Sequence, residues 1–401
     1  EDSGRTMLML ALFTPSALAA PRTSTVYLMR HCSRSTYLPD LYGGQQPQYL
    51  ANYTNGGDLP DWGVLPQLCT ARGRRIVTGQ GRALRSEFLE KLRGPENAKL
   101  LKVIYDAGYV RDNTTAEDFL VGLGLAGFAR EGGAEVFSPP WCPKLAPAAK
   151  IKAVEERLSA VPKPARYAER IAALQAILGK GVAPPMPDIP DSVSGGPVGL
   201  LGGSFVASSW IETMLLQQGA GLPMAYGRVS AEEMYGMLEL HVYYRAVADR
   251  GVAIEERGES NLLAHMMRDL EGQADGGVSL YVGHDTNLDG ISALLDLAWR
   301  SAAPFPANTT APGSLLRLTA TGSGAAATVK GAFLYTTFET DLGNVTETEI
   351  TFGNGRTSIT LGELNAQAST AIDPSCVKLP GAAKSAAAAM VETAAAGRAA
   401  P

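Results

Sequence analysis

The chain has 401 residues, of which 45% are hydrophobic and 19% are charged, so it is long and apolar enough for one large or two ordinary globular domains. Its formal net charge of -5 gives no general attraction to nucleic acid or to an anionic membrane. We therefore expect no nucleic-acid partner, and any site for an anion has to be local.

The first segment has the features of a signal peptide. Residues 1–20 contain Arg5, the apolar stretch "MLMLALF", and the small residues Ala17 and Ala19 before an expected cleavage site. This pattern predicts a secreted or periplasmic protein. A truncated or misassigned N-terminus is the alternative, because the apolar stretch is short. No other run approaches the length of a membrane span, so we expect no membrane contact beyond export.

The following segments predict alternating strands and helices. "STVYLMRH" (residues 24–31) is an apolar, β-branched run that is typical of a buried strand. Residues 72–92 space their apolar side chains as a helix does, although glycines weaken the pattern. A second strand is expected from Leu101, in "LKVIYDAG", and a helix after Thr115. This order predicts an α/β fold with parallel neighbouring strands.

The middle of the chain changes character. Pro-rich stretches separate segments with helical patterns near residues 148–178, 204–219 and 230–249. We interpret residues 136–254 as a helical cap inserted into an α/β domain. That domain is then formed by residues 21–135 and 255–381.

The last part of the chain returns to the strand pattern. "VSLYVGHDTNLDG" (278–290) reads as a strand followed by a turn, and residues 315–338 predict a hairpin. The Ala-rich tail, residues 382–401, is of low complexity and indicates no chemistry.

No pattern predicts a cofactor or a metal. "GLGLAG" (122–127) matches the dinucleotide-binding motif, but that motif needs a strand before it, and here a helical pattern precedes it. We interpret this segment as a helix end. The four cysteines lack the close spacing of a zinc site and fit up to two disulfides in an exported protein: Cys32, Cys69, Cys142 and Cys376. Their pairing stays open.

Two short turns carry the candidate chemistry. Arg30, His31 and Arg34 follow the first strand, and like charges at this spacing repel unless an anion lies between them. His284 follows the strand that ends in "LYVG". Because ligands bind beyond the carboxyl ends of parallel strands, both turns are expected to face one ligand.

A phosphate fits this site, since guanidinium groups bind its oxygens with forked hydrogen bonds. We expect Arg30 and Arg34 to bind the phosphate and neutral His31 to attack phosphorus. Asp285 is expected to protonate the leaving oxygen, and His284 to donate to the phosphoryl oxygens. An acid that works while protonated predicts an acidic pH optimum.

These residues resemble a known family. "MRHCSRST" and "GHDTNL" are similar to the two motifs of the histidine acid phosphatases, an Arg-His-Gly-x-Arg-x-Pro motif and a His-Asp motif. Three segments of the helical region are similar to the bacterial periplasmic phytase branch: "SSWIETMLLQQGAGLP" (208–223), "YGRV" (226–229) and "LELH" (238–241). The resemblance implies a mainly parallel mixed sheet flanked by helices, like that of phosphoglycerate mutase, with an inserted helical domain. It covers residues 26–299.

The resemblance also implies further site residues. Arg111, in "DAGYVRDN", lies where the family has another phosphate-binding arginine. Glu212 matches a glutamate on the substrate side of the pocket, and Thr286 follows the motif aspartate as it does in phytases. No metal or cofactor takes part in the chemistry that this family implies.

The sequence departs from the family pattern in its first motif. Cys32 replaces the motif glycine and Thr36 the proline, so the backbone path of the turn is expected to differ. A disulfide from Cys32 to Cys69 is one pairing that would tether it; free or otherwise paired thiols are the alternative. Leu38 stands where bacterial phytases carry a phosphate-binding lysine, which weakens the phytase interpretation but not the phosphatase one.

We expect an exported phosphomonoesterase that acts on a small-molecule substrate through a phosphohistidine. Inositol hexakisphosphate (phytate) is the leading substrate, and a broad-specificity acid phosphatase or glucose-1-phosphatase is the alternative. A catalytically inactive phosphate-binding relative and a phosphoglycerate mutase are further alternatives. The intact set of motif residues argues against the first, and the His284-Asp285 pair with the signal peptide argues against the second.

Overall fold

The computed structural model describes residues 23–36, 48–57, 59–92, 94, 97, 100–196, 198–272 and 277–379. Three predicted features lie outside these residues: the signal peptide, Leu38 and the Ala-rich tail. No helix in the described part combines the length and the apolar character that crossing a membrane requires.

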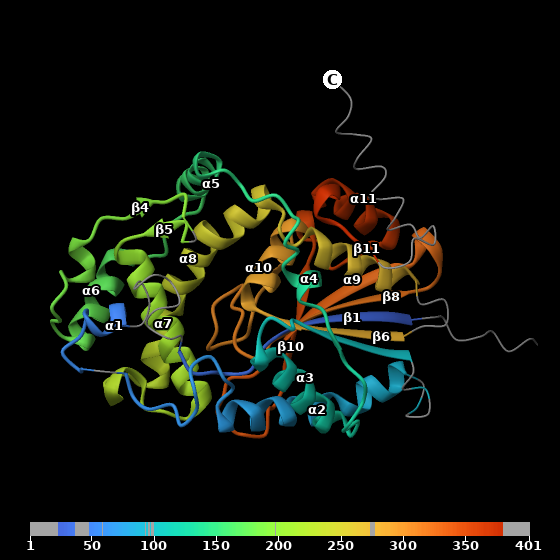
Figure 1. The fold of residues 1–401 in the computed structure, drawn as a ribbon, viewed down its shortest axis with the longest axis horizontal. Helices are drawn as coiled ribbons and strands as arrows, with labels where there is room; N and C mark the ends of the chain where they lie inside the picture. Colours follow the sequence, from blue (N-terminus) through green and yellow to red (C-terminus); the bar gives the residue numbers. More distant parts are fainter. Residues whose placement is uncertain are drawn as a thin grey trace, which may run out of the picture.

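A mixed β-sheet forms the body of the molecule (Figure 1). The strand order is β3-β2-β6-β1-β8-β9-β10-β7, and β11 pairs with β9. Strands β3, β2, β6 and β1 are parallel, whereas the pairs from β1–β8 onward are antiparallel. The strands are β1 (Thr23–Arg30), β2 (Leu101–Tyr105), β3 (Glu131–Gly132), β6 (Gly277–Gly283), β7 (Ala298–Trp299), β8 (Leu315–Thr321), β9 (Thr328–Tyr335), β10 (Thr346–Thr351) and β11 (Ser358–Thr360). The expected α/β fold, including the hairpin of β8 and β9, is confirmed.

Strand β1 lies inside the sheet, with β6 on one side and β8 on the other. Its side chains alternate between two hydrophobic cores, because successive residues of a strand point to opposite faces. Tyr27 and Met29 enter one core, and Val26 and Leu28 enter the other. This burial on both faces explains why the strand reads as a continuous apolar run.

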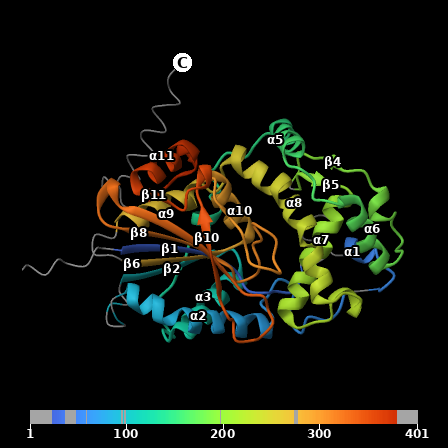
Figure 2. The ribbon, with the colours of Figure 1, turned by 180° about the vertical axis from the view of Figure 1, so that it is seen from behind.

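Helices cover both faces of the sheet (Figures 1 and 2). Helices α2 (Ala71–Lys91) and α3 (Val110–Leu123) pack together on one face. The other face carries α9 (Ser260–Gly272), α10 (Asp285–Leu294) and α11 (Leu361–Ala371). The sheet is therefore the middle layer of three.

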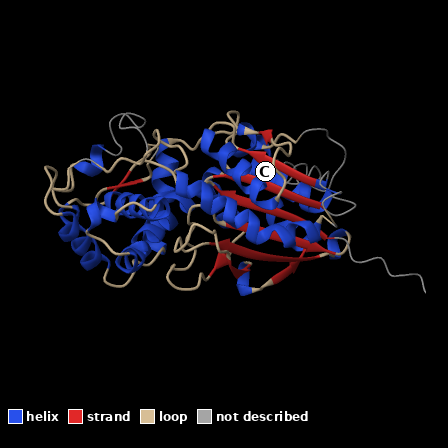
Figure 3. Ribbon diagram, turned by 90° about the horizontal axis from the view of Figure 1, so that it is seen from below, coloured by secondary structure: helices blue, strands red, loops and turns tan. Residues whose placement is uncertain are grey.

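The remaining helices lie together beyond one end of the strands (Figure 3). They are α1 (Gln48–Ala51), α5 (Pro147–Ala160), α6 (Tyr167–Leu178), α7 (Gly203–Ala220) and α8 (Ala231–Glu256), with the short hairpin of β4 (Ser192–Val193) and β5 (Leu200–Leu201), while α4 (Ala134–Phe137) contacts α9. Leu28 of β1, Trp210 of α7 and Leu238 of α8 belong to one hydrophobic core. The division into an α/β domain and a cap stays a prediction.

One predicted helix start was wrong. The second helix begins at Val110, not after Thr115, so Arg111 lies in its first turn. The polar segment after Arg111 reads as a loop, and burial of that turn against the rest of the protein overrides this local preference. The helical stretch expected near residues 148–178 comprises two helices, α5 and α6, and the segment between them contains Pro162 and Pro164.

"GLGLAG" is a helix end, as expected. Helix α3 ends at Leu123, and Gly124 adopts a left-handed backbone with φ of 78°. Glycine takes this conformation without strain, which is why it commonly follows the last residue of a helix.

The four cysteines form two disulfides. Cys32 bonds Cys69, which is the pairing that would tether the first motif, and Cys142 bonds Cys376. The second bond links positions 234 residues apart in the sequence, joining the loop after α4 to the segment after α11. Trp141 donates from Nε1 to the Cys376 carbonyl at 3.0 Å beside it.

The glycines inside α2 allow a close helix contact, and this gives a test of the packing. A Cβ at Gly81 would lie 2.2 Å from the Phe119 carbonyl oxygen of α3, whereas one at Gly236, on the exposed side of α8, would meet nothing within 4 Å. We expect Gly81→Ala to lower the free energy of unfolding by about 1–3 kcal/mol through overpacking. Gly236→Ala should raise it by about 0.5–1 kcal/mol, because alanine is the better helix former. Urea denaturation measures both, and equal effects would contradict this account.

Candidate active site

Three neighbouring parallel strands bring the expected motif residues together. In the sheet, β6 lies between β1 and β2, and Arg30 of β1 is in register with Gly283 of β6. His31 and His284 follow these positions directly, and their ring centroids are 5.5 Å apart. Arg111 enters from the first turn of α3, which follows β2. Residues far apart in the sequence therefore meet at one edge of the sheet.

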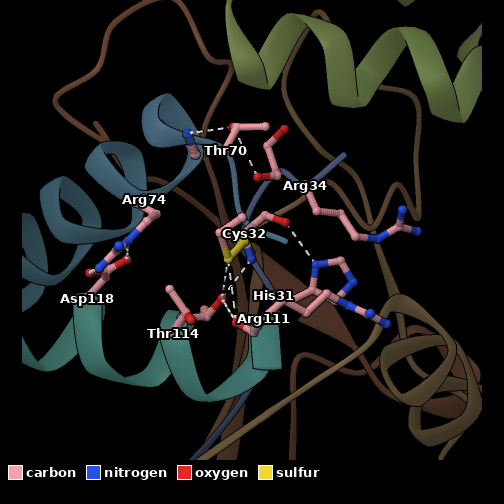
Figure 4. Close-up of a disulfide and its surroundings, with 12 residues drawn as sticks. His31, Cys32, Arg34, Thr70, Arg74, Arg111, Thr114 and Asp118 are labelled. Atoms are coloured by element: carbon pink, nitrogen blue, oxygen red, sulfur yellow. Dashed lines mark hydrogen bonds and ion pairs between the residues drawn. A yellow bond between two sulfur atoms is a disulfide. The ribbon is translucent and has the colours of Figure 1, made fainter. Parts of the chain in front are cut away.

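The hydrogen bonding of His31 selects one tautomer. Its Nδ1 lies 2.8 Å from the backbone carbonyl oxygen of Cys32 (Figure 4). A carbonyl only accepts, so Nδ1 carries the proton and donates it. The lone pair of the neutral ring is then on Nε2. The ring is held in the form that a nucleophile requires.

Charge and burial keep His31 neutral. Burial lowers the pKa of His31 well below its usual value, and the surrounding guanidinium groups act in the same direction: Arg111, Arg34 and Arg30. Figure 4 shows the side chains of Arg34 and Arg111 extending to the same side as the His31 ring. A histidine in this setting stays unprotonated in mildly acidic solution.

The turn that carries His31 is fixed from several sides. The Cys32–Cys69 disulfide ties it to the residues before α2, and a β-bridge joins Arg34 to Cys69. The Cys32 amide donates to the Thr115 hydroxyl of α3 at 3.0 Å. The Ser33 hydroxyl donates to the Leu216 carbonyl of α7 at 2.8 Å. The replacement of the motif glycine by Cys32 thus adds a covalent tether.

Arg30 is buried, with 1% of its side chain exposed, and two carboxylates compensate its charge. Its Nη2 forms an ion pair with Glu212 of α7, and lies 3.1 Å from Asp285. Burial acts to raise the pKa of Glu212, but Arg30 and His241 outweigh it, and this pKa is lowered. Glu212 is therefore an ionised partner of Arg30.

Asp285 is ionised in this structure, although the expected proton donor is a protonated carboxyl. Burial acts to raise the pKa of Asp285, but the guanidinium groups of Arg245 and Arg30 hold it well below its usual value. The residue opens α10, where the positive end of the helix dipole also favours an anion. The Thr286 amide donates to Asp285 Oδ1 at 2.9 Å.

His284 uses both ring nitrogens in contacts with protein groups. Its Nε2 lies 3.0 Å from Asp106 Oδ2 and 3.4 Å from Asp112 Oδ2, and its Nδ1 lies 3.3 Å from Arg111 Nη2. Arginine only donates, so Nδ1 accepts and Nε2 carries the proton toward Asp106. Burial lowers the pKa of His284, Asp106 acts to raise it, and the net shift is downward. Neutral His284 thus has no spare N–H for a phosphate.

Asp112 shares this cluster in a different protonation state. Its side chain has no exposed surface, and burial raises its pKa to about 9, with the Asp106 charge acting in the same direction. The carboxyl is therefore neutral at neutral pH. Asp106, Asp112 and His284 each place one oxygen or nitrogen atom within 4.8 Å of the others, but the protonated Asp112 carboxyl and the N–H at His284 Nε2 do not suit a cation. The guanidinium of Arg111 beside His284 opposes a cation there.

A cavity of about 300 Å³ adjoins the motif residues. Arg34, Glu212, Asp285 and Thr286 contribute to its wall, which places both expected pocket residues, Glu212 and Thr286, beside it. Thr286 is exposed and also lines the two neighbouring cavities. Thr286 therefore lies where the three cavities adjoin.

Comparisons with solved structures identify the fold, whereas no protein-family model and no curated protein matches. The phytase from Citrobacter braakii is 22% identical, with a TM-score of 0.74 over 89% of this chain and 100% of that one. Hafnia alvei phytase in complex with myo-inositol hexakis sulphate is 19% identical, with a TM-score of 0.75 over 90% and 100%. Klebsiella sp ASR1 phytase is 17% identical, with a TM-score of 0.72 over 89% and 98%. The chain has the fold of the bacterial phytases.

Within this phytase fold, sequence reasoning missed four charged or titratable residues at the site. Asp106 directly follows strand β2, as His31 follows β1, so its position in the sequence was a usable signal. Asp112 was hidden by the wrong helix start. His241 and Arg245 lie four residues apart on one face of α8, where helical spacing makes them neighbours.

Asp112 makes the stability of this phytase fold depend on pH. Its pKa is about 9 in the folded chain, against an ordinary value of 3.8, so the folded state binds more protons between these values. The contribution of Asp112 to stability therefore falls as pH rises through this window. Asparagine resembles the neutral acid and does not titrate. We expect the stability of Asp112→Asn relative to the unsubstituted protein to increase from about pH 4 to about pH 8 in urea denaturation; a constant difference would contradict the assignment.

Proposed function

We propose that this chain is an exported histidine acid phosphatase that hydrolyses phosphomonoesters through a phosphohistidine. The observation that carries the proposal is the state of His31. Its ring is neutral, its Nε2 bears no proton, and three arginines surround it. The two disulfides support export, because such bonds persist in oxidising compartments.

The arginines supply the binding energy for the phosphate. Arg30, Arg34 and Arg111 present guanidinium groups around the His31 ring, as their effect on its protonation indicates. Guanidinium groups bind phosphate oxygens in pairs and stabilise the charge that spreads over them in the transition state. Glu212 and Asp285 balance the charge of Arg30, and a bound phosphate would take over part of that role.

The reaction transfers the phosphoryl group twice. His31 Nε2 attacks phosphorus, the bond from phosphorus to the ester oxygen breaks, and Asp285 delivers a proton to that oxygen. Water then attacks the phosphohistidine with ionised Asp285 as the base, which releases phosphate and free His31. His284 donates to the phosphoryl oxygens once Nδ1 is protonated and Arg111 turns to the phosphate.

Phytate is the first candidate substrate, supported by the phytase fold and by the motif resemblance. Smaller monoesters such as glucose 1-phosphate are the second, and one feature of the cavity favours them. Besides Arg34 and Arg245, its wall includes the carboxyl groups of Glu212 and Asp249 and the apolar ring of Phe205, which do not attract further phosphate groups. Turnover on phytate and on glucose 1-phosphate, measured across acidic pH, decides between them.

His31→Ala should reduce turnover of nitrophenyl phosphate to background, because the acceptor of the phosphoryl group is lost. Acid-quenched wild-type protein, mixed with labelled substrate, should carry the label on His31. The His241→Ala variant is the matched control, since His241 bonds Ser208 and Glu212 and is not the phosphoryl acceptor. Label on a serine or an aspartate would sink the mechanism, and an absence of turnover in the unsubstituted protein would favour an inactive phosphate-binding relative.

Asp285→Asn separates proton donation from phosphate binding. We expect turnover of alkyl phosphates to fall by about 10²–10⁴-fold, as loss of a general acid does. Nitrophenyl phosphate should lose much less, because nitrophenolate departs without a proton. Arg34→Ala should instead weaken inhibition by inorganic phosphate and slow every substrate alike. An equal loss on both substrate types in Asp285→Asn would rule out Asp285 as the acid.

A further inference from the structure

A second guanidinium group, besides that of Arg30, reaches the carboxyl of Asp285. Arg245 of α8 places Nη1 at 3.5 Å from Asp285 Oδ2, on a side chain that is 12% exposed. Arg30, the last residue of strand β1, places its Nη2 3.1 Å from the same oxygen. Asp285 therefore lies between a cation of the sheet and a cation of the helical region.

Arg245 does not depend on Asp285 for its own position. Its Nε donates to Asp289 Oδ2 of α10 at 2.6 Å, and its Nη1 lies 3.3 Å from Asp249. Asp289 has only 2% of its side chain exposed, and its other oxygen accepts from Arg250 Nε at 3.1 Å. A buried carboxylate bonded on both oxygens is a firm anchor, since breaking such a pair leaves an uncompensated charge.

We propose that Arg245 is a positioning residue, which holds the carboxyl of Asp285 in place as an anion until the substrate phosphate binds. This inference rests on the proposed phosphatase function. Arg245 acts through its contact with Asp285. Asp289 keeps Arg245 beside Asp285 when Arg30 turns from Asp285 to the phosphate.

The proton of the acid is then taken up with the substrate. A phosphate dianion beside Asp285 withdraws Arg30 and adds negative charge, and both changes favour the protonated carboxyl. Asp285 binds a proton from solvent. It passes that proton to the ester oxygen as the bond between this oxygen and phosphorus breaks and the bond from His31 Nε2 to phosphorus forms.

Groups from every surrounding element act on Asp285. The arginines and histidines are Arg30, His31 and Arg34 of β1 and the turn after it, His241 and Arg245 of α8, and His284. The carboxyl groups are Asp112 of α3, Glu212 of α7, Asp249 of α8, and Asp289, which lies on the same helix as Asp285. Among the charged groups that lower the pKa of Asp285, Arg245 has the largest effect. Removing its charge should therefore leave Asp285 protonated to a higher pH.

The test is the pH profile of turnover for an alkyl phosphate. We expect Arg245→Gln, which keeps a hydrogen-bond donor for Asp289, to shift the alkaline limb of the pH profile of kcat to higher pH by about one unit or more. The limb for nitrophenyl phosphate should not move, because this substrate needs no acid. Arg245→Lys keeps the charge and should stay closer to the unsubstituted profile.

Arg250→Gln is the matched control. Arg250 lies on the same helix and bonds the same Asp289, on the oxygen that Arg245 does not use. Arg250→Gln should leave the alkaline limb of the kcat profile at the same pH. If Arg245→Gln lowers kcat equally at every pH, or shifts both substrates together, Arg245 is merely structural and the proposal is overturned.

A binding measurement covers the case in which Arg245→Gln does not fold. Sulfate is a dianion that does not titrate in this range, and its binding to the unsubstituted protein should be coupled to uptake of a proton. Calorimetry in buffers of different ionisation enthalpy measures this uptake, which Asp285→Asn should reduce. The uptake that remains belongs to His284, and an uptake that is the same in Asp285→Asn would also overturn the proposal. Sulfate binding without proton uptake would overturn the proposal. Absence of turnover in the unsubstituted protein would instead refute the phosphatase function itself, so the two failures are distinguishable.

Discussion

The burial of the Arg30 guanidinium at the edge of the sheet is the constraint on which the site depends. An unpaired charge in such a position would cost several kcal/mol, so carboxylates must reach it. One comes from Glu212 on α7, in the helical region, and one from Asp285 at the start of α10. This single cation therefore joins the sheet, the helix after β6 and the helices beyond the strand ends. The cavity lies where these three parts meet.

The same concentration of positive charge sets the protonation of the histidines. His31 stays neutral because its neighbours are guanidinium groups and it has almost no contact with water. His284 is also neutral, although Asp106 opposes the shift. Such perturbed groups gather at functional sites, since burial and fixed charges there are arranged to tune reactivity. The cations that would bind an anion are thus also what keeps His31, the proposed nucleophile, unprotonated.

Charges alternate in sign from the helical region to the sheet. Arg250, Asp289, Arg245, Asp285 and Arg30 contact one another in this order. Alternation allows each buried ion to have a partner of opposite charge, as buried charges require. It also makes the carboxyl of Asp285 depend on Arg245 of α8 and on Asp289, which anchors Arg245. A bound anion that displaces one member of the series changes the balance for the next.

The sequence by itself determined the strands β1, β2 and β6, the hairpin of β8 and β9, the two motif turns and the edge of the sheet at which these turns meet. A strand buried on both faces reads as an apolar run, and the turns after such strands lie at one edge when the strands are parallel. Helix starts were less certain, because polar residues such as those after Arg111 favour a loop until tertiary contacts bury the turn. The pairing of Cys32 with Cys69 also stayed open, since spacing does not define a disulfide.

Only the tertiary structure decided the charge state of the site. The sequence motif predicts that Asp285 is a proton donor and therefore protonated, but Arg245 and Arg30 keep it ionised in the folded chain. Arg245 reaches it from α8, 40 positions earlier in the sequence, and no local pattern links the two. The protonation of a buried group depends on distances to charges that the fold brings together, and those distances are set by packing between elements.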